Sequence, residues 1–141
     1  MADINEQLIA SIQMRALLAS EDEIFSGIGT SLPREEQDKV AAAASLSVSD
    51  LFGIGRDFYH RTLRPVIEDL ICGKIKYCAN RSSYDTATSV VRLVAEQVGE
   101  AIVQAHSGPK GAGEAAGKLL VDTSAAVLKE GLNKLCHCPN P

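Results

Sequence analysis

Hydrophobic positions recur every three to four residues through most of the chain, which is the pattern of helices that each bury one face. The clearest case is the segment 47–78, where apolar side chains keep one helical stripe from Val48 to Ile75 and stay in phase across Pro65. Because proline interrupts helical hydrogen bonding, we predict a long central helix that is kinked at Pro65, or else two nearly collinear helices. No stretch shows the alternation of apolar and polar positions that is typical of strands.

The first 46 residues contain shorter helical patterns separated by turn signals. Ser20 and Glu23 form a capping-box pattern, and Pro33 stands where a helix tolerates proline, in its first turn. The intervening sequence GIGTSLP is interpreted as a connector. Gly55, Gly99 and the alanine-rich faces permit helices to approach closely, either within the chain or between copies.

The glycine-rich stretch HSGPKGAGEAAGKLL (residues 106–120) raises the question of a phosphate-binding loop. Such a loop needs Gly, four residues and Gly-Lys-Ser/Thr after a buried strand. Here Leu119 replaces the hydroxyl residue, and the preceding segment has a helical pattern. We therefore expect no nucleotide site and interpret the stretch as a turn between two helices, the second of which runs to Leu135. A short turn makes residues 83–135 an antiparallel helical hairpin.

These patterns predict an all-α fold, a single-domain helical bundle of four to six helices over residues 1–141. Its expected parts are N-terminal helices in 1–46, the long kinked helix in 47–78, the C-terminal antiparallel helical hairpin in 83–135 and a cysteine-containing tail in 136–141. The chain has three Phe, three Tyr and no Trp, so the core must consist mainly of aliphatic side chains.

Charge is unevenly distributed along the chain. The net charge of −4 argues against general nucleic-acid binding. The segment 56–81, however, holds six Lys and Arg against three Asp and Glu, whereas the remainder holds eight against fifteen. Within this segment Arg56, His60 and Arg64 recur at four-residue intervals and form a basic ridge. The ridge could hold an anion or an acidic helix of a partner, or it could be an ordinary solvated helix surface.

No apolar run approaches the roughly 20 residues of a membrane span. The first residues also lack the charged and apolar regions of a signal peptide. We therefore expect a cytoplasmic protein with no membrane span.

Four cysteines stand at chain positions that the predicted hairpin brings together: Cys72 and Cys78 in CGKIKYC, and Cys136 and Cys138 in CHCPNP, with His137 between the last two. Six helical positions separate the first pair by about 9 Å along the axis, so these two cannot bond each other within a regular helix. Three interpretations stay open. They are a metal site, with zinc as the candidate ion and all five residues as candidate ligands, disulfides that staple the tail, and small buried thiols beside a frayed tail.

The sequence gives catalysis no positive support, because neither a serine–histidine–acid pattern nor the paired carboxylate–histidine signature of a di-iron bundle is evident. We predict a small non-enzymatic helical protein with an interaction, scaffold or regulatory function, which binds a protein partner or associates with itself. The alternative is a thiol redox or metal-handling (zinc-binding) protein, in which the cysteine cluster is the function itself.

Overall fold

The computed structural model describes residues 4–105 and 114–139, and every regular element within these residues is helical. The all-α fold class is thereby confirmed for the described part of the chain. The expected turn at residues 106–113 lies outside the described residues. The elements are, in chain order, α1 (Glu6–Leu18), α2 (Glu21–Ser31), α3 (Arg34–Ala44), α4 (Leu51–Phe58), the π-helix η1 (Tyr59–Leu63), α5 (Arg64–Glu68), the π-helix η2 (Asp69–Lys74), the 3-10 helix η3 (Arg81–Ser83), α6 (Ala87–Ala105), α7 (Glu114–Glu130) and α8 (Leu132–Leu135).

The N-terminal helices begin at side-chain caps. Asn5 caps α1 by accepting a hydrogen bond from the backbone N–H of Leu8 at 2.8 Å. Ser20 and Glu23 cap α2 reciprocally, with bonds of 3.1 and 2.9 Å, and this confirms the predicted capping box. The interpretation of GIGTSLP as a connector was wrong for its first part, because α2 continues helically to Ser31.

Glycines let α2 and α4 approach closely at this point. A side chain on Gly55 of α4 would overlap the carbonyl oxygen of Phe25, and one on Gly29 of α2 would overlap that of Leu51. The two helices therefore touch backbone to backbone, which only glycine permits. Gly55 serves a contact within the chain, whereas a side chain at Gly99 would meet no atom within 4 Å.

Helical structure runs without interruption from α4 through η1 and α5 to η2. It begins at Leu51, because Asp50 caps α4 by accepting a 2.9 Å hydrogen bond from the N–H of Gly53. The predicted segment began at residue 47, so the helix starts later than expected. Immediately before Pro65 the helix widens, and the N–H of Arg64 bonds the carbonyl of Tyr59, five residues earlier. Such π-helical turns accommodate disturbances of the regular ladder. A kink at Pro65 stays a prediction.

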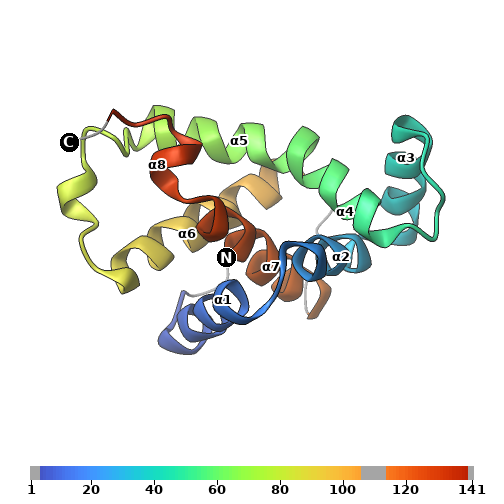
Figure 1. The fold of residues 1–141 in the computed structure, drawn as a ribbon, viewed down its shortest axis with the longest axis horizontal. Helices are drawn as coiled ribbons and strands as arrows, with labels where there is room; N and C mark the ends of the chain where they lie inside the picture. Colours follow the sequence, from blue (N-terminus) through green and yellow to red (C-terminus); the bar gives the residue numbers. More distant parts are fainter. Residues whose placement is uncertain (1–3, 106–113, 140–141) are drawn as a thin grey trace.

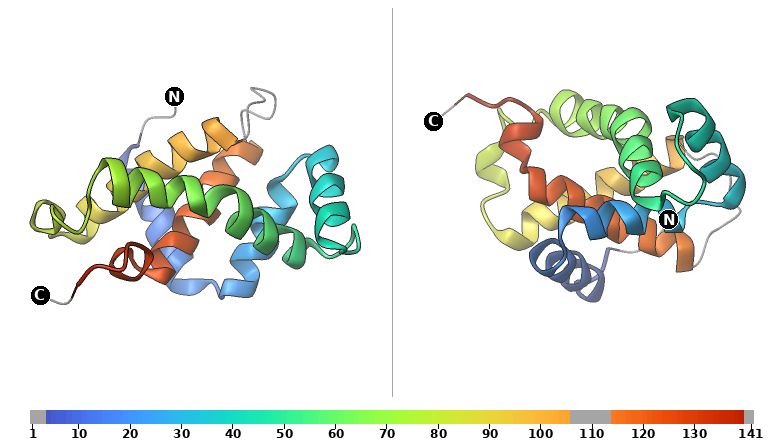
Figure 2. Two further views of the ribbon diagram at one scale, coloured as in Figure 1. Left: turned by 90° about the horizontal axis from the view of Figure 1, so that it is seen from above. Right: turned by 45° about the vertical axis from the view of Figure 1, so that its right-hand side comes forward.

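The helix at the centre of the molecule is α7. Its residues from Leu119 to Val127 are buried, apart from the partly buried Val121. It packs against α1, α2 and α6, and small side chains such as Ala125 and Ala126 let these neighbours approach from several sides. Figures 1 and 2 show α6 and α7 crossing one another, so the predicted side-by-side hairpin layout is not what these views display.

The helix expected to reach Leu135 ends at Glu130. Gly131, which adopts φ +90°, separates α7 from the short α8 and redirects the chain. The tail then passes beside the segment that follows η2, at the end of the molecule opposite α3 (Figures 1 and 2). With these breaks, the described residues contain more helices than the four to six expected.

Candidate functional site at the cysteine pole

The structure brings all four cysteines together at one end of the molecule. Cys72 is bonded to Cys136, and Cys78 is bonded to Cys138, with a Cα–Cα distance of 5.3 Å in both disulfides. Of the three interpretations that the sequence left open, the structure shows the disulfide pairing. We call the four cysteines and His137 the cysteine pole.

Local backbone structure places the first two cysteines in different directions. Cys72 lies within η2, whereas Cys78 follows the end of that helix. Lys76 adopts a left-handed conformation with φ +57°, and the N–H of Tyr77 bonds the carbonyl of Ile71 at 3.0 Å. This turn ends the long helical run, so that each cysteine faces a different residue of the tail.

The tail is held at the pole by more than its sulfur atoms. Leu132 and Leu135 of α8 are buried in the main core. The Arg81 side chain donates hydrogen bonds to Asn133 Oδ1 at 3.3 Å and to the Pro139 carbonyl at 3.1 Å. These contacts fix both ends of the segment that carries Cys136 and Cys138.

The structure does not show the metal site that the sequence suggested for the cysteine pole. Within the described ranges, no three or more His, Cys, Asp or Glu side chains are arranged to hold a metal ion. His137 is exposed and adopts φ +52°. Because both disulfides consume their thiols, the oxidised pole offers no thiolate ligand.

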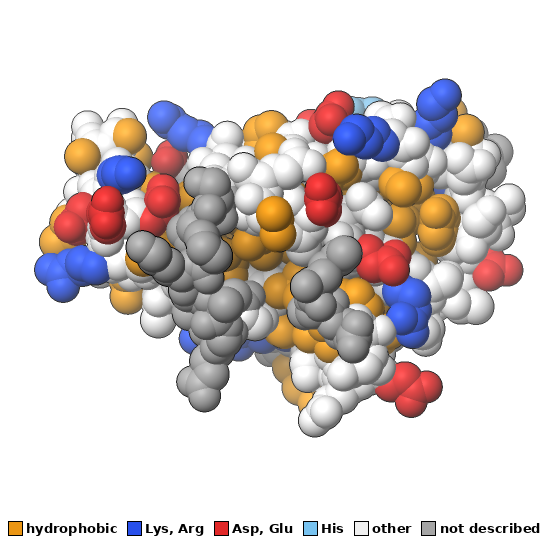
Figure 3. All heavy atoms as spheres, turned by 180° about the vertical axis from the view of Figure 1, so that it is seen from behind, with side chains coloured by type: hydrophobic (Ala, Val, Ile, Leu, Met, Phe, Trp, Pro, Cys, Tyr) orange, Lys and Arg blue, Asp and Glu red, His pale blue; other side chains and the backbone are white. Residues whose placement is uncertain are grey.

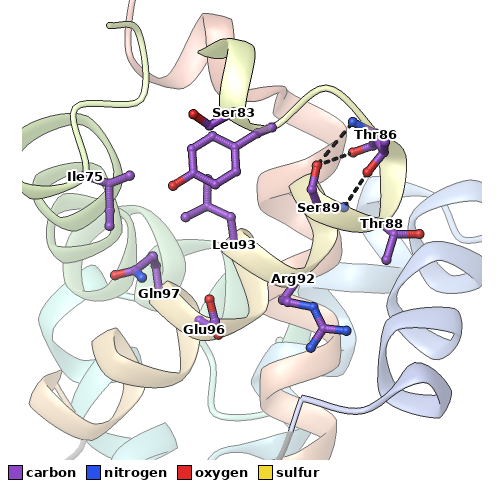
Figure 4. A pocket seen from close by; sticks show the side chains of 10 residues that line it. Ile75, Ser83, Thr86, Thr88, Ser89, Arg92, Leu93, Glu96 and Gln97 are labelled. Atoms are coloured by element: carbon purple, nitrogen blue, oxygen red, sulfur yellow. Dashed lines mark hydrogen bonds between the residues drawn. The ribbon is translucent and has the colours of Figure 1, made fainter. Parts of the chain in front are cut away.

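A shallow hollow with a volume of about 370 Å³ lies next to the cysteine pole. Figure 4 shows that Ile75 forms one side, while residues from the start of α6 form the other. Three of its polar residues make hydrogen bonds within the fold: Thr86 and Ser89 bond each other at the start of α6, and Arg92 donates to the Ile4 carbonyl at 2.7 Å. We assign no ligand to this hollow.

The basic ridge of Arg56, His60 and Arg64 is only partly available at the surface. Arg64 Nε donates to Glu130 Oε1 at 3.1 Å, and a second bond joins Nη2 to the other carboxylate oxygen. Burial lowers the pKa of His60, and the nearby positive charges of Arg56 and Arg64 lower it further. Arg64 therefore ties α5 to the end of α7. On the face drawn in Figure 3, basic and acidic side chains are mixed, and neither kind forms a large patch of its own.

Sequence reasoning missed a group of buried polar residues on α7. Asp122, Thr123 and Ser124 are at most 1% exposed. Arg15 Nε donates to Asp122 Oδ1 at 2.7 Å, whereas Oδ2 has no hydrogen-bond partner among the described residues and lies against Gly27. Burial raises the pKa of Asp122, and Arg15 opposes this effect. A run of three polar residues inside the otherwise apolar stretch 119–128 was the available signal.

In the part of the chain that the structure describes, no helix combines the length and apolar character needed to cross a bilayer. Comparison with protein-family models, curated proteins and solved structures found no match for this chain.

Proposed function

We propose that this protein is a small non-enzymatic helical interaction protein that associates with a second copy of itself through the outer face of α1. The observation that carries the proposal is a row of apolar residues on that face, which we call the α1 stripe: Ala10, Met14, Leu17 and Leu18. The last three side chains are 57%, 78% and 71% exposed. Their spacing of i, i+4, i+7 and i+8 places all four on one side of a helix.

The other side of α1 is already in use. Ile9 and Ile12 are buried against Val91 and Ala95 of α6. A surface helix normally presents polar side chains opposite its buried face, so a second apolar row calls for a partner. The stripe has the spacing by which helices insert into apolar grooves or pack on one another.

A second copy suits this surface because the stripe carries no charge. Pairing about a two-fold axis would place each stripe against the other, with no like-charge contact between them. Full burial of a Leu or Met side chain contributes about 1.5–3 kcal/mol, so six largely exposed side chains supply roughly 6–10 kcal/mol. Association itself costs at least about 4 kcal/mol. The remainder is about 2–6 kcal/mol, so we expect a weak dimer, with a dissociation constant on the order of 1 mM.

Sedimentation equilibrium of the full oxidised chain, over concentrations up to the millimolar range, tests this proposal. The wild-type protein should show a concentration-dependent increase in mean mass. The double variant Leu17→Ser/Leu18→Ser should remain monomeric. The matched control is Val48→Ser/Val103→Ser, which removes two other exposed apolar side chains, 52% and 65% exposed, and should associate like the wild type.

Two results would overturn the proposal. One is a wild-type protein that stays monomeric throughout the concentration range. The other is equal association of the wild type and the Leu17→Ser/Leu18→Ser variant, because the contact would then lie elsewhere. Circular dichroism of both variants checks that each retains the helical fold, which is expected because the replaced side chains are exposed.

A further inference from the structure

We propose that the cysteine pole, once its disulfides are reduced, binds one Zn²⁺ ion through the four thiolates of Cys72, Cys78, Cys136 and Cys138. The site would exist only in the reduced protein, and it is independent of the α1 stripe. The pole would thus exchange two covalent crosslinks for one metal crosslink between the same segments.

The first support is that the two disulfides lie next to each other. Both Cα–Cα distances are 5.3 Å, and Cys78 Sγ lies 3.7 Å from the carbonyl oxygen of Cys136, a residue of the other disulfide. Sulfur atoms in a disulfide are about 2 Å apart, and in a tetrahedral site with Zn–S bonds of about 2.3 Å they are about 3.8 Å apart. Opening each sulfur pair from the first spacing to the second is the change in geometry that metal binding requires.

The second support is that the tail has anchors which do not depend on sulfur. Leu135 is fully buried, and Arg81 bonds both Asn133 and Pro139. Backbone bonds also shape the tail, since the N–H of Cys138 donates to the Asn133 carbonyl at 2.9 Å. Reduction removes the crosslinks without removing these contacts, and the thiols stay close together.

The third support is the local charge. A zinc ion with four thiolates carries a net charge of −2, and cationic neighbours stabilise thiolates. Lys74 and Lys76 stand between the first two cysteines, Lys134 lies two residues before Cys136, and Arg81 contacts the tail. Arg81 is therefore one cation held at the tail, and the lysines flank the cysteines in the sequence.

The chemistry balances with a dithiol reductant. Each disulfide takes up two electrons and two protons and becomes two thiols, while the reductant dithiol is oxidised to a disulfide. Zn²⁺ then replaces the four thiol protons, which are released to solvent. A compartment that keeps thiols reduced would favour the state that can bind the metal.

Titration with Co²⁺ tests the proposal directly. The full chain is reduced with dithiothreitol, separated from it without oxygen, and titrated while visible absorption is recorded. We expect the bands of tetrahedral cobalt–thiolate coordination to saturate at one Co²⁺ per chain and to disappear when one equivalent of Zn²⁺ is added. The oxidised protein should show no such bands.

Two variants separate the four-thiolate site from its alternatives. Cys78→Ser/Cys138→Ser removes one pair of ligands and should abolish the tetrahedral bands. His137→Asn should bind Co²⁺ like the wild type, and Asn suits the left-handed conformation at that position. Far-ultraviolet circular dichroism of the reduced proteins, compared with the oxidised wild type, verifies that the fold persists.

The proposal is overturned if the reduced, folded wild type shows no tetrahedral bands. It is also overturned if Cys78→Ser/Cys138→Ser retains them, or if His137→Asn loses them, because the ligands would then differ from the four cysteines. Unfolding of the reduced wild type that Zn²⁺ does not reverse would contradict it as well.

Discussion

Arg15 of α1 reaches across to Asp122 of α7, and its Nε lies 2.7 Å from Oδ1 of that buried carboxyl group. The same guanidinium donates to the Glu23 carbonyl at 3.2 Å, so one side chain links α1, the start of α2 and the central helix. The second oxygen of Asp122 receives no such bond among the described residues. Burial therefore outweighs pairing and raises the pKa of this carboxyl group.

The raised pKa of Asp122 gives stability a defined dependence on pH. Folding favours the protonated carboxyl, so its contribution to stability is greatest below the ordinary carboxyl pKa of about 4 and is lost as pH rises through the raised value. The free energy of unfolding of the wild type, relative to Asp122→Asn, should therefore fall as pH increases above 4. Urea denaturation of both proteins between about pH 3 and pH 7 measures this difference.

A relative stability that instead rises with pH would show that the bond from Arg15 dominates over burial. Asp38→Asn is the control, because Asp38 and its partner Arg34 are exposed and 3.8 Å apart. Exposed pairs contribute about 0–1 kcal/mol, so this variant should stay close to the wild type across the same range.

The backbone contact between α2 and α4 should make Gly55→Ala strongly destabilising. The new Cβ would overlap the carbonyl oxygen of Phe25, and backbone atoms can move aside only by separating the two helices. We expect a loss of at least about 3 kcal/mol in the free energy of unfolding. Gly99→Ala is the matched control, because it meets no atom within 4 Å and should stabilise α6 by about 0.5–1 kcal/mol. Equal effects of the two substitutions in thermal or urea unfolding would rule out the close contact.

The two disulfides should contribute to stability in a strongly non-additive way. A crosslink over 64 residues restricts the unfolded chain by about 4 kcal/mol. Once either disulfide is present, the other closes a loop of only about eight residues and adds about 2.5 kcal/mol. Cys72→Ser/Cys136→Ser and Cys78→Ser/Cys138→Ser should each lose about 2.5 kcal/mol, and the fourfold variant about 6–7 kcal/mol. Urea denaturation under non-reducing conditions measures the free energy of unfolding of the wild type and the three variants. A loss of about 4 kcal/mol on removing either disulfide alone would contradict this reasoning.

Local signals were sufficient to predict the helical character of the chain. Apolar spacing within each segment identifies helices, and Ser20 with Glu23 identifies a helix start, because these interactions connect residues three or four positions apart. The meeting of the tail with Cys78 was also foreseen. Its route differs, however, since Gly131 redirects the chain and α6 crosses α7.

Features that depend on distant residues were not predictable from the sequence. A helical segment that is buried on nearly all sides, such as residues 119–127 of α7, has no single apolar face for periodicity to detect. The close contact of α2 at Gly29 depends on Gly55, which lies on another helix. Whether the cysteines form disulfides depends on distances that exist only in the folded chain. Their spacing in the sequence could not decide between a metal site, disulfides and free thiols.

The positions of the two disulfides make residues 79–135 part of a closed covalent ring. This ring contains α6 and α7, including the most deeply buried segment of the protein. A protease that cuts one peptide bond within the ring leaves the two fragments joined through sulfur. The fragments can separate only after both crosslinks are opened, so the integrity of the C-terminal half is governed by thiol chemistry as well as by the peptide backbone.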